Sequence, residues 1–180
     1  ASNLRGTSLV SNSIIQDWAS ATGNGINLVN NNTNLTKLTV SATTFNGTAT
    51  NNDGIFMEAQ GSSSMALSVE NGSVFTDIFG DGVQVNGITG ATGTVDAIIK
   101  NSTFNNAATL GNGGISLNPF GAVTFNATID GNTFDTLMRP VTNLGAIGGT
   151  NGLTANATIK IKKAKFHGEW NYTISPRRQT

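Results

Sequence analysis

The chain has 180 residues, with ten Lys and Arg against ten Asp and Glu, one His and no Cys, so its formal net charge is zero. Charged residues make up only 11%, whereas Asn, Thr, Ser and Gly together fill 85 of the 180 positions. This composition excludes charge-driven disorder, disulfides, thiolate metal sites, a membrane-spanning helix and a helical bundle, and it gives no overall attraction to nucleic acid.

Two kinds of short segment alternate along the chain. Segments of the first kind end in a large apolar residue, and segments of the second kind read Gly–apolar–x–apolar. In both kinds apolar and polar residues alternate between flanking Gly, Asn and Ser, which predicts β-strands with one buried face. In chain order they cover residues 8–15, 25–28, 38–45, 54–57, 67–75, 82–85, 97–104, 114–117, 127–134, 145–147 and 159–166.

The large apolar residue recurs with a nearly constant period. Its spacings are 30, 30, 29, 30 and 32 residues, at Ile15, Phe45, Phe75, Phe104, Phe134 and Phe166. Chance does not keep such a period through five steps, so it indicates a repeat architecture.

A corner is predicted inside each segment of the first kind, between its alternating run and its terminal apolar residue. Asn and Gly predominate there, and these residues adopt a left-handed backbone at low cost. The corner positions are Asn12, Ala42, Asn71 with Gly72, Asn101, Gly131 and Lys163.

Identical units stacked about 4.8 Å apart form a parallel solenoid. Over residues 8–166 the sequence resembles the right-handed parallel β-helix superfamily, and its composition is similar to the Asn/Thr/Gly-rich passenger regions of bacterial autotransporter-type surface adhesins. We therefore predict an all-β, right-handed parallel β-helix of about six coils of roughly 30 residues over residues 1–167. Residues 168–180 are predicted to form a C-terminal cap or exchange strand and a tail, because solenoids must hide their terminal edges.

Stacking turns the repeat into columns of side chains. Three inward columns are predicted to form the core, since burial of each such side chain contributes roughly 1.5–3 kcal/mol before entropy is subtracted. They are the Phe column; Ile26, Ile55, Val83 and Ile115; and Val40, Val69, Ile99, Ile129 and Ile161.

The outward positions offer several candidate contact surfaces. A column beside the core changes the sign of its charge from coil to coil, which predicts either register support or a strip that contacts carbohydrate. Its members are Ser41, Glu70, Lys100, Asp130 and Lys162. Phe56 is predicted to point outward, and Trp18 occupies a loop, so each either packs against the protein or contacts a ligand.

Catalytic signals are few. The single histidine, His167, gives no basis for a catalytic triad or a histidine metal site. The resemblance to the β-helix superfamily, which includes pectin lyases and glycoside hydrolases, implies that an enzyme would need carboxylates on adjacent coils. Asp53, Asp77 and Asp81 are the candidates, although Asp-Gly also occurs in ordinary turns. We predict no cofactor and no metal, with a calcium site at these three residues as the alternative.

The charges are unevenly distributed. Residues 1–138 carry a net charge of −6 and residues 139–180 a net charge of +6. A basic end either protects an edge strand from aggregation, docks on an anionic cell surface, or meets the acidic body of another copy head to tail. Its possible contact residues are Lys160, Lys162, Lys163, Lys165, Arg177 and Arg178.

These features predict a non-enzymatic structural or adhesive module, extracellular or on a bacterial cell surface, whose partners are copies of itself or cell-surface carbohydrate. No nucleic-acid partner and no membrane span are expected. The alternatives are a polysaccharide-active β-helix enzyme, a tailspike-like carbohydrate binder, and an ice-binding solenoid.

Overall fold

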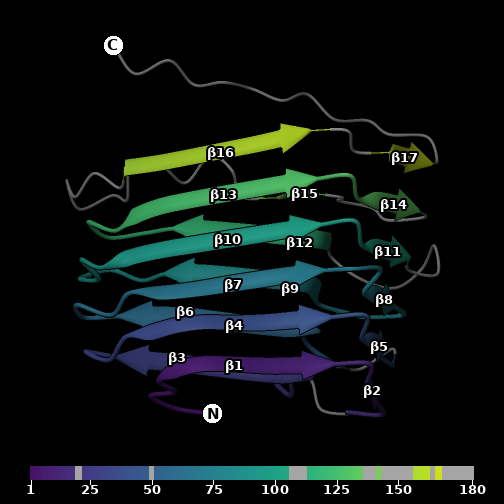
Figure 1. The fold of residues 1–180 in the computed structure, drawn as a ribbon, viewed down its shortest axis with the longest axis horizontal. Coiled ribbons are helices and arrows are strands. Elements are labelled where there is room, and N and C mark those ends of the chain that lie inside the picture. The colour runs from purple at the N-terminus through teal and green to yellow at the C-terminus, as the bar shows by residue number, and fades with distance from the viewer. Residues whose placement is uncertain are drawn as a thin grey trace.

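The computed structural model describes residues 1–18, 22–48, 51–105, 113–135, 141–142, 156–162 and 165–167. Its described residues form strands that pair in parallel with the strands of the next turn, and they include no helix. In Figure 1 the front strands run to the right, the strands behind run to the left, and the chain climbs from β1 to β16. The fold is therefore an all-β, right-handed parallel β-solenoid, as predicted.

The strands form three sheets, one on each side of the solenoid. Sheet 1 contains β1 (Gly6–Ser11), β4 (Leu35–Ser41), β7 (Met65–Glu70), β10 (Thr94–Lys100), β13 (Thr124–Asp130) and β16 (Asn156–Lys162). Sheet 2 contains β2 (Ile14–Gln16), β5 (Thr44–Asn46), β8 (Val74–Thr76), β11 (Thr103–Asn105), β14 (Thr133–Asp135) and β17 (Lys165–His167). Sheet 3 contains β3 (Ile26–Asn31), β6 (Ile55–Gln60), β9 (Asp81–Gly87), β12 (Gly113–Pro119) and β15 (Val141–Thr142).

The prediction of about six coils was too high. Four three-strand turns, β1–β3, β4–β6, β7–β9 and β10–β12, are complete in the part of the chain that the structure describes. The motif with a terminal apolar residue occurs six times because it marks sheets 1 and 2, which have six described strands each, whereas sheet 3 has five. In the fifth turn sheet 3 continues through Val141 and Thr142, which pair with Ile115 and Ser116. The predicted strand at 145–147 and the predicted cap at 168–180 lie outside the described residues.

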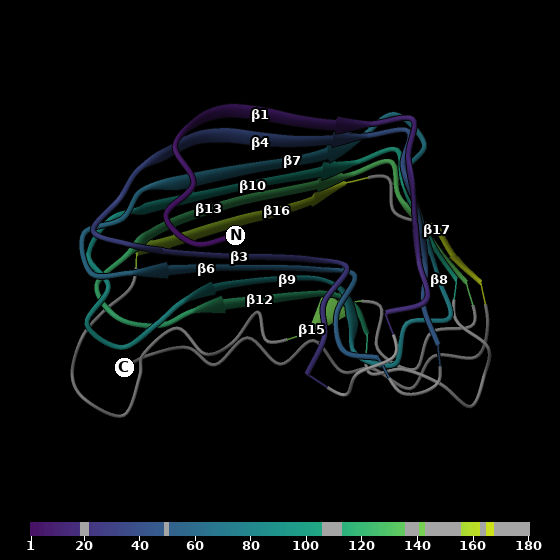
Figure 2. The same ribbon diagram turned by 90° about the horizontal axis from the view of Figure 1, so that it is seen from below.

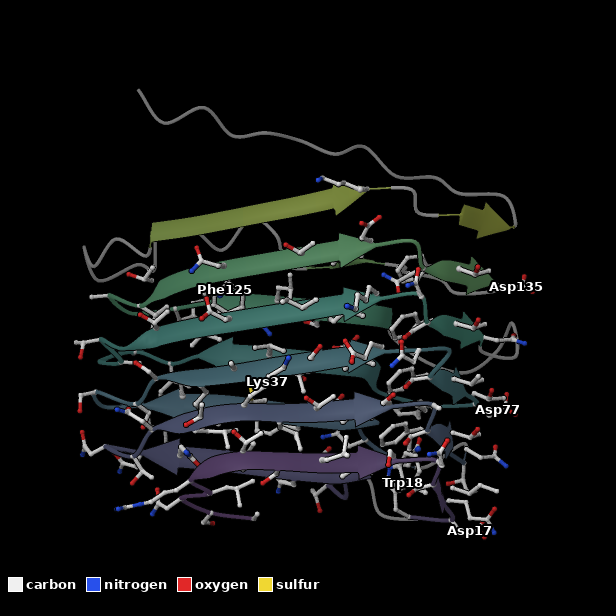
Figure 3. The ribbon with its side chains drawn as sticks, viewed as in Figure 1. Asp17, Trp18, Lys37, Asp77, Phe125 and Asp135 are labelled. Atoms are coloured by element: carbon white, nitrogen blue, oxygen red, sulfur yellow. The ribbon has the colours of Figure 1, made fainter. Side chains whose placement is uncertain are left out.

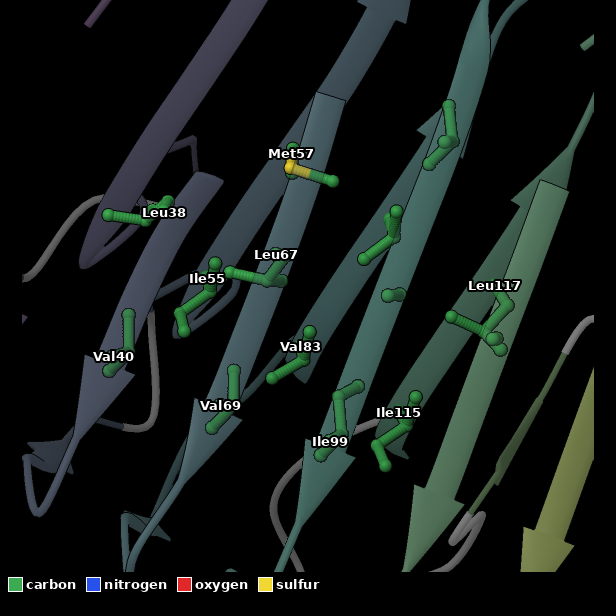
Figure 4. Close-up of a cluster of buried hydrophobic side chains, with 14 of the residues drawn as sticks. Leu38, Val40, Ile55, Met57, Leu67, Val69, Val83, Ile99, Ile115 and Leu117 are labelled. Carbon is green, nitrogen blue, oxygen red and sulfur yellow. The ribbon is translucent and has the colours of Figure 1, made fainter. Parts of the chain in front are cut away.

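The core lies between sheets 1 and 3, which face each other, while sheet 2 closes one end (Figure 2). Figure 4 shows the aliphatic side chains of both sheets meeting in the interior. The second predicted column is confirmed by the pairs Ile26–Ile55, Ile55–Val83 and Val83–Ile115. In the third column Val40, Val69, Ile99 and Ile129 are fully buried and in register.

Phenylalanine rings cover the inner face of sheet 2. The ring centroids of Phe45 and Phe75 are 4.7 Å apart, those of Phe75 and Phe104 4.8 Å, and those of Phe104 and Phe134 5.1 Å. The interplanar angles are only 5°, 5° and 12°, so the rings stack face to face at the spacing of neighbouring strands. Phe166 continues the column by its backbone register with Phe134.

The corners between sheets 1 and 2 have the predicted left-handed backbone. Every predicted corner in the described residues has a positive φ: Asn12 (48°), Ala42 (47°), Asn71 (56°), Gly72 (76°), Asn101 (49°) and Gly131 (67°). Lys163 lies outside the described residues. The corner is thus set by backbone geometry, which Asn and Gly tolerate and Ala tolerates less well.

Removal of one ring from the Phe column should cost much of the stability. Phe104 is buried between two stacked rings, so Phe104→Ala should lower the free energy of unfolding by about 3–5 kcal/mol. Thr128→Ala, on the outward side of β13, serves as the control and should cost much less. Urea denaturation of both variants measures the difference, and equal losses would contradict the inward register.

The corner at Ala42 provides a second test of the fold. Ala42 is exposed and left-handed, so Ala42→Gly relieves its backbone strain and should raise the free energy of unfolding by about 1 kcal/mol. Ala66→Gly, on the outer face of β7, should instead lower it by about 0.5–1 kcal/mol. Thermal and urea denaturation compare the two, and a destabilised Ala42→Gly variant would contradict the left-handed corner.

Candidate functional site

Asp53 and Asp77 lie in loops that connect sheet 2 to sheet 3, and Asp81 follows such a loop as the first residue of β9. We call the described residues here, 17–18, 22–25, 47–48, 51–54 and 77–81, the loop layer. The residue before the first Gly of the sheet 3 motif is Asn24, Asp53 or Asp81 in successive turns. Because the turns stack in register, these three side chains form one column, which we call the Asx ladder.

Asn24 and Asp53 each bond through a side-chain oxygen to the backbone of the next turn. Asp53 N donates to Asn24 Oδ1 at 3.0 Å, and Asp81 N donates to Asp53 Oδ1 at 2.8 Å. The backbone continues the pattern, since Gly25 N donates to Asp53 O at 3.0 Å and Gly54 N to Asp81 O at 2.9 Å. The structure therefore brings Asp53 and Asp81 together across the stack and gives Asp53 an inter-turn bonding role.

Burial sets the electrostatics of Asp53. Its side chain is only 2% exposed, and its Oδ2 has no hydrogen-bond partner in the described protein. Burial raises its pKa to about 7; the hydrogen bond from Asp81 N lowers the pKa, and repulsion from the Asp81 carboxylate raises it. Asp53 is thus a carboxyl group that holds its proton up to neutral pH.

Asp77 lies apart from this pair, at the other end of its loop. It is the first residue after β8, has a φ of 52°, and donates its N–H to Asn105 O at 3.2 Å. Figure 3 shows Asp17 and Asp77 on the same side of the molecule as Asp135. Among the described residues no three His, Asp or Glu side chains are placed to hold a metal ion.

The loops enclose the carboxyl of Asp53. Asn51 is fully buried and its Oδ1 accepts the Phe79 N–H at 2.7 Å. A Cβ added to Gly80 would lie 2.5 Å from Asp53 Oδ1 and 2.9 Å from Asn52 Oδ1, so these oxygens pack directly on the Gly80 backbone. A polysaccharide could not reach Asp53 without movement of the loops.

The predicted charge ladder forms one ion pair within the described residues. Lys100 Nζ lies 3.2 Å from Glu70 Oε2, and the Ser68 hydroxyl donates to the same oxygen at 3.0 Å. The hydrogen bonds from Ser68 and Lys100 lower the pKa of Glu70. Ser41, Asp130 and Lys162 occupy the predicted positions in the register of sheet 1.

The two predicted aromatic contact residues differ in their surroundings. Phe56 is half-buried on the outer side of β6, between Asn27 and Gln84 of the neighbouring strands. Trp18 packs edge-on against Phe45, with ring centroids 6.4 Å apart and an interplanar angle of 85°. Trp18 therefore contributes to the end of the aromatic column, while Phe56 faces outward as predicted.

Three of the six predicted contact residues at the basic end lie within the described residues. β16 places Lys160 and Lys162 opposite Thr128 and Asp130, and Lys162 is exposed. β17 places Lys165 opposite Thr133. Lys163, Arg177 and Arg178 lie outside the described residues.

Our interpretation of the sequence missed a buried polar column beneath the corners. The hydroxyl groups of this column donate to carbonyl oxygens just before the bend, as in Thr43 to Ser41 O at 3.0 Å and Ser102 to Lys100 O at 3.0 Å. At its upper end Asn132 Nδ2 donates to Ile99 O at 2.8 Å, and Asn132 Oδ1 accepts the Ser102 N–H at 3.0 Å. A periodic signal was present, because a Ser, Thr or Asn stands two residues before five of the six terminal apolar residues, at Ser13, Thr43, Ser73, Ser102 and Asn132.

Comparisons of the chain with protein-family models, with curated proteins and with solved structures found no match. Among the described residues no helix is long and apolar enough to cross a membrane. The solenoid fold therefore stands on the structure alone, and the similarity to autotransporter passenger regions stays a prediction.

The stability of the protein should depend on the ionisation of Asp53. Its pKa is about 7 in the folded state against 3.8 for an unperturbed carboxyl, so the folded state binds more protons between these values. The contribution to stability is fully present below pH 3.8 and is lost as the pH rises to about 7. Asp53→Asn keeps the oxygen acceptor, as Asn24 does, and cannot ionise. At pH 8 this variant should be more stable than the natural protein by up to about 4 kcal/mol.

Urea denaturation between pH 4 and pH 9 measures this effect. The difference between the two proteins should shrink towards zero at pH 4. Asp17→Asn, which replaces an exposed carboxylate, is the control and should follow the natural protein. Parallel pH profiles for Asp53→Asn and the natural protein would show that Asp53 ionises normally in the fold.

Proposed function

We propose that this chain is a non-enzymatic structural or adhesive module of an extracellular, bacterial cell-surface protein. The observation that carries the proposal is that its buried polar groups hold the fold together. In the Asx ladder and in the column beneath the corners, side-chain oxygens accept backbone N–H groups of a neighbouring turn. The outer faces meanwhile carry long columns of short polar side chains, which suit contact with a hydroxyl-rich surface.

The outer face of sheet 2 is the most regular of these surfaces. Successive strands place short side chains in two columns about 4.8 Å apart along the solenoid. One column contains Thr44, Val74, Thr103 and Thr133, and the other contains Asn46, Thr76, Asn105 and Asp135. Hydroxyl and amide groups at regular spacing can bond to a polymer of sugars. Val74 interrupts the Thr column, which counts against ice binding.

The rival proposal, a polysaccharide-active enzyme, has less support. Glycoside hydrolases of the two-carboxylate type place both groups beside the scissile bond, where substrate reaches them. Here Asp53 is 2% exposed, and its Oδ1 accepts the backbone N–H of Asp81. Catalysis at this pair would require the loop layer to open.

The uneven distribution of charge favours one kind of structural role, which is head-to-tail assembly. In a solenoid the order of residues along the chain is their order along the axis, as the colours of Figure 1 show. The excess of acidic residues therefore lies along the body, and exposed Lys162 belongs to the basic end. A basic end that meets the acidic body of a second copy gives a heterologous contact, which repeats without closure.

A panel of neutral and acidic polysaccharides, with and without calcium, tests the adhesive role. The protein should bind at least one polymer in affinity electrophoresis without shortening it and without a calcium requirement. New reducing ends or unsaturated sugars would identify an enzyme and overturn the proposal. Val74→Lys, which places a charge in the Thr column, should weaken binding several-fold, whereas Ala66→Lys on sheet 1 is the matched control.

Light scattering across a range of salt concentration tests the assembly. Charge-driven association should be strongest at 0.1 M salt, where the Debye length is about 10 Å, and should weaken towards 1 M, where it is about 3 Å. Lys162→Glu should weaken association at low salt, with Lys37→Glu on the body as the control. A protein that stays monomeric at low salt and high concentration would contradict head-to-tail contact.

A further inference from the structure

The backbone N–H groups of three consecutive residues in the third turn donate hydrogen bonds to three consecutive residues in the second turn. Phe79 N donates to Asn51 Oδ1 at 2.7 Å, Gly80 N to the backbone oxygen of Asn52 at 3.3 Å, and Asp81 N to Asp53 Oδ1 at 2.8 Å. Two of the three acceptors are side-chain oxygens. The closure of this part of the loop layer therefore depends on the state of those side chains.

Asp53 is the one ionisable group among the three acceptors. It is 2% exposed, and its Oδ2 has no hydrogen-bond partner in the described protein. Above it the charge of Asp81 opposes ionisation, and Asp77 lies at the far end of that loop. Below it residues 22–25 contain no titratable side chain. A buried carboxylate in these surroundings has no positive partner, whereas a neutral carboxyl is tolerated at much lower cost.

The first turn provides a natural comparison. There the same position is Asn24, whose Oδ1 accepts the Asp53 N–H at 3.0 Å, as Asp53 Oδ1 accepts the Asp81 N–H. An amide makes this bond at any pH. The connection between the first and second turns is therefore independent of pH, while the connection between the second and third turns includes a group that titrates.

We propose that Asp53 is a proton-operated clasp between the second and third turns. With a neutral Asp53 carboxyl the loop that carries Phe79 and Asp81 is closed. Ionisation of Asp53 favours release of that loop, because water can then solvate the carboxylate. The proposal rests on the fold and is independent of the proposed adhesive role.

Opening of the clasp would uncover apolar surface. Ile78 is 1% exposed, and a Cβ added to Gly54 would lie 2.9 Å from Ile78 Cδ1 and 3.0 Å from Phe75 Cδ1. Ile78 therefore covers Gly54 beside the Phe column. Phe79, already 47% exposed, would move with it. A rise in pH would thus expose an apolar patch at one place in the solenoid while the sheets remain paired.

Amide hydrogen exchange at pH 6 and pH 8.5, corrected for the intrinsic rate, tests the clasp. With a folded pKa of about 7, the opening constant at Phe79 and Asp81 should rise about tenfold between these pH values. The Asp53 amide, held by Asn24, and the Thr103 amide, held by Ser73 O at 2.9 Å, should keep their protection. Asp53→Asn should abolish the rise at Phe79 and Asp81.

Each other outcome overturns the proposal. Unchanged protection at Phe79 and Asp81 in the natural protein would mean that ionisation does not open the loop. Loss of protection across all sheets would mean global unfolding in place of a local clasp. Should Asp53→Asn fail to fold, the contrast between the Asp81 and Asp53 amides of the natural protein still decides between these outcomes.

Discussion

Parallel pairing in register, repeated from turn to turn, is the constraint on which the structure depends. Each strand bonds to the strand one turn away, so each side chain lies over its counterpart about 30 residues earlier. The rings of Phe45 and Phe75 are 4.7 Å apart, which is the spacing of the strands themselves. Side chains of one column must therefore be able to stack on their own kind, which aromatic rings, aliphatic groups, amides and hydroxyls can do.

The same constraint explains where polar groups are buried. A hydroxyl or amide in the interior is stable only when it is bonded, and its partner is either a preceding residue of the same turn or a residue of a neighbouring turn. Ser102 illustrates this, because its hydroxyl bonds to Lys100 O and its N–H to Asn132 Oδ1 of the next turn. Carboxylates do not stack well. Where Asp53 lies beneath Asp81, burial raises the pKa of the lower carboxyl, repulsion from Asp81 adds to the effect, and Asp53 keeps its proton to near neutrality.

Much of the fold was predictable because it follows from periodicity. The recurrence of Phe predicted sheets 1 and 2, the alternation predicted the core columns, and Asn or Gly at the corners predicted the left-handed bends at positions such as Asn101. The number of complete turns was not predictable in this way, since sheet 3 has a weaker motif and its fifth strand is only Val141–Thr142. The site was predicted in part. The spacing of Asp53 and Asp81 indicated that they would meet, but burial and hydrogen bonding decide their state, and both depend on loops without a fixed length.

Its burial and its hydrogen bond from Asp81 N distinguish Asp53 from a catalytic carboxyl group that is open to substrate. The central claim is that the Asx ladder joins the turns and that its buried member, Asp53, is neutral under acidic conditions because of its place in that ladder. A carbon-detected NMR titration of the Asp53 carboxyl measures this most directly. The account predicts a midpoint near pH 7. A midpoint near the unperturbed value of 3.8 would show a solvated carboxylate and would contradict the ladder.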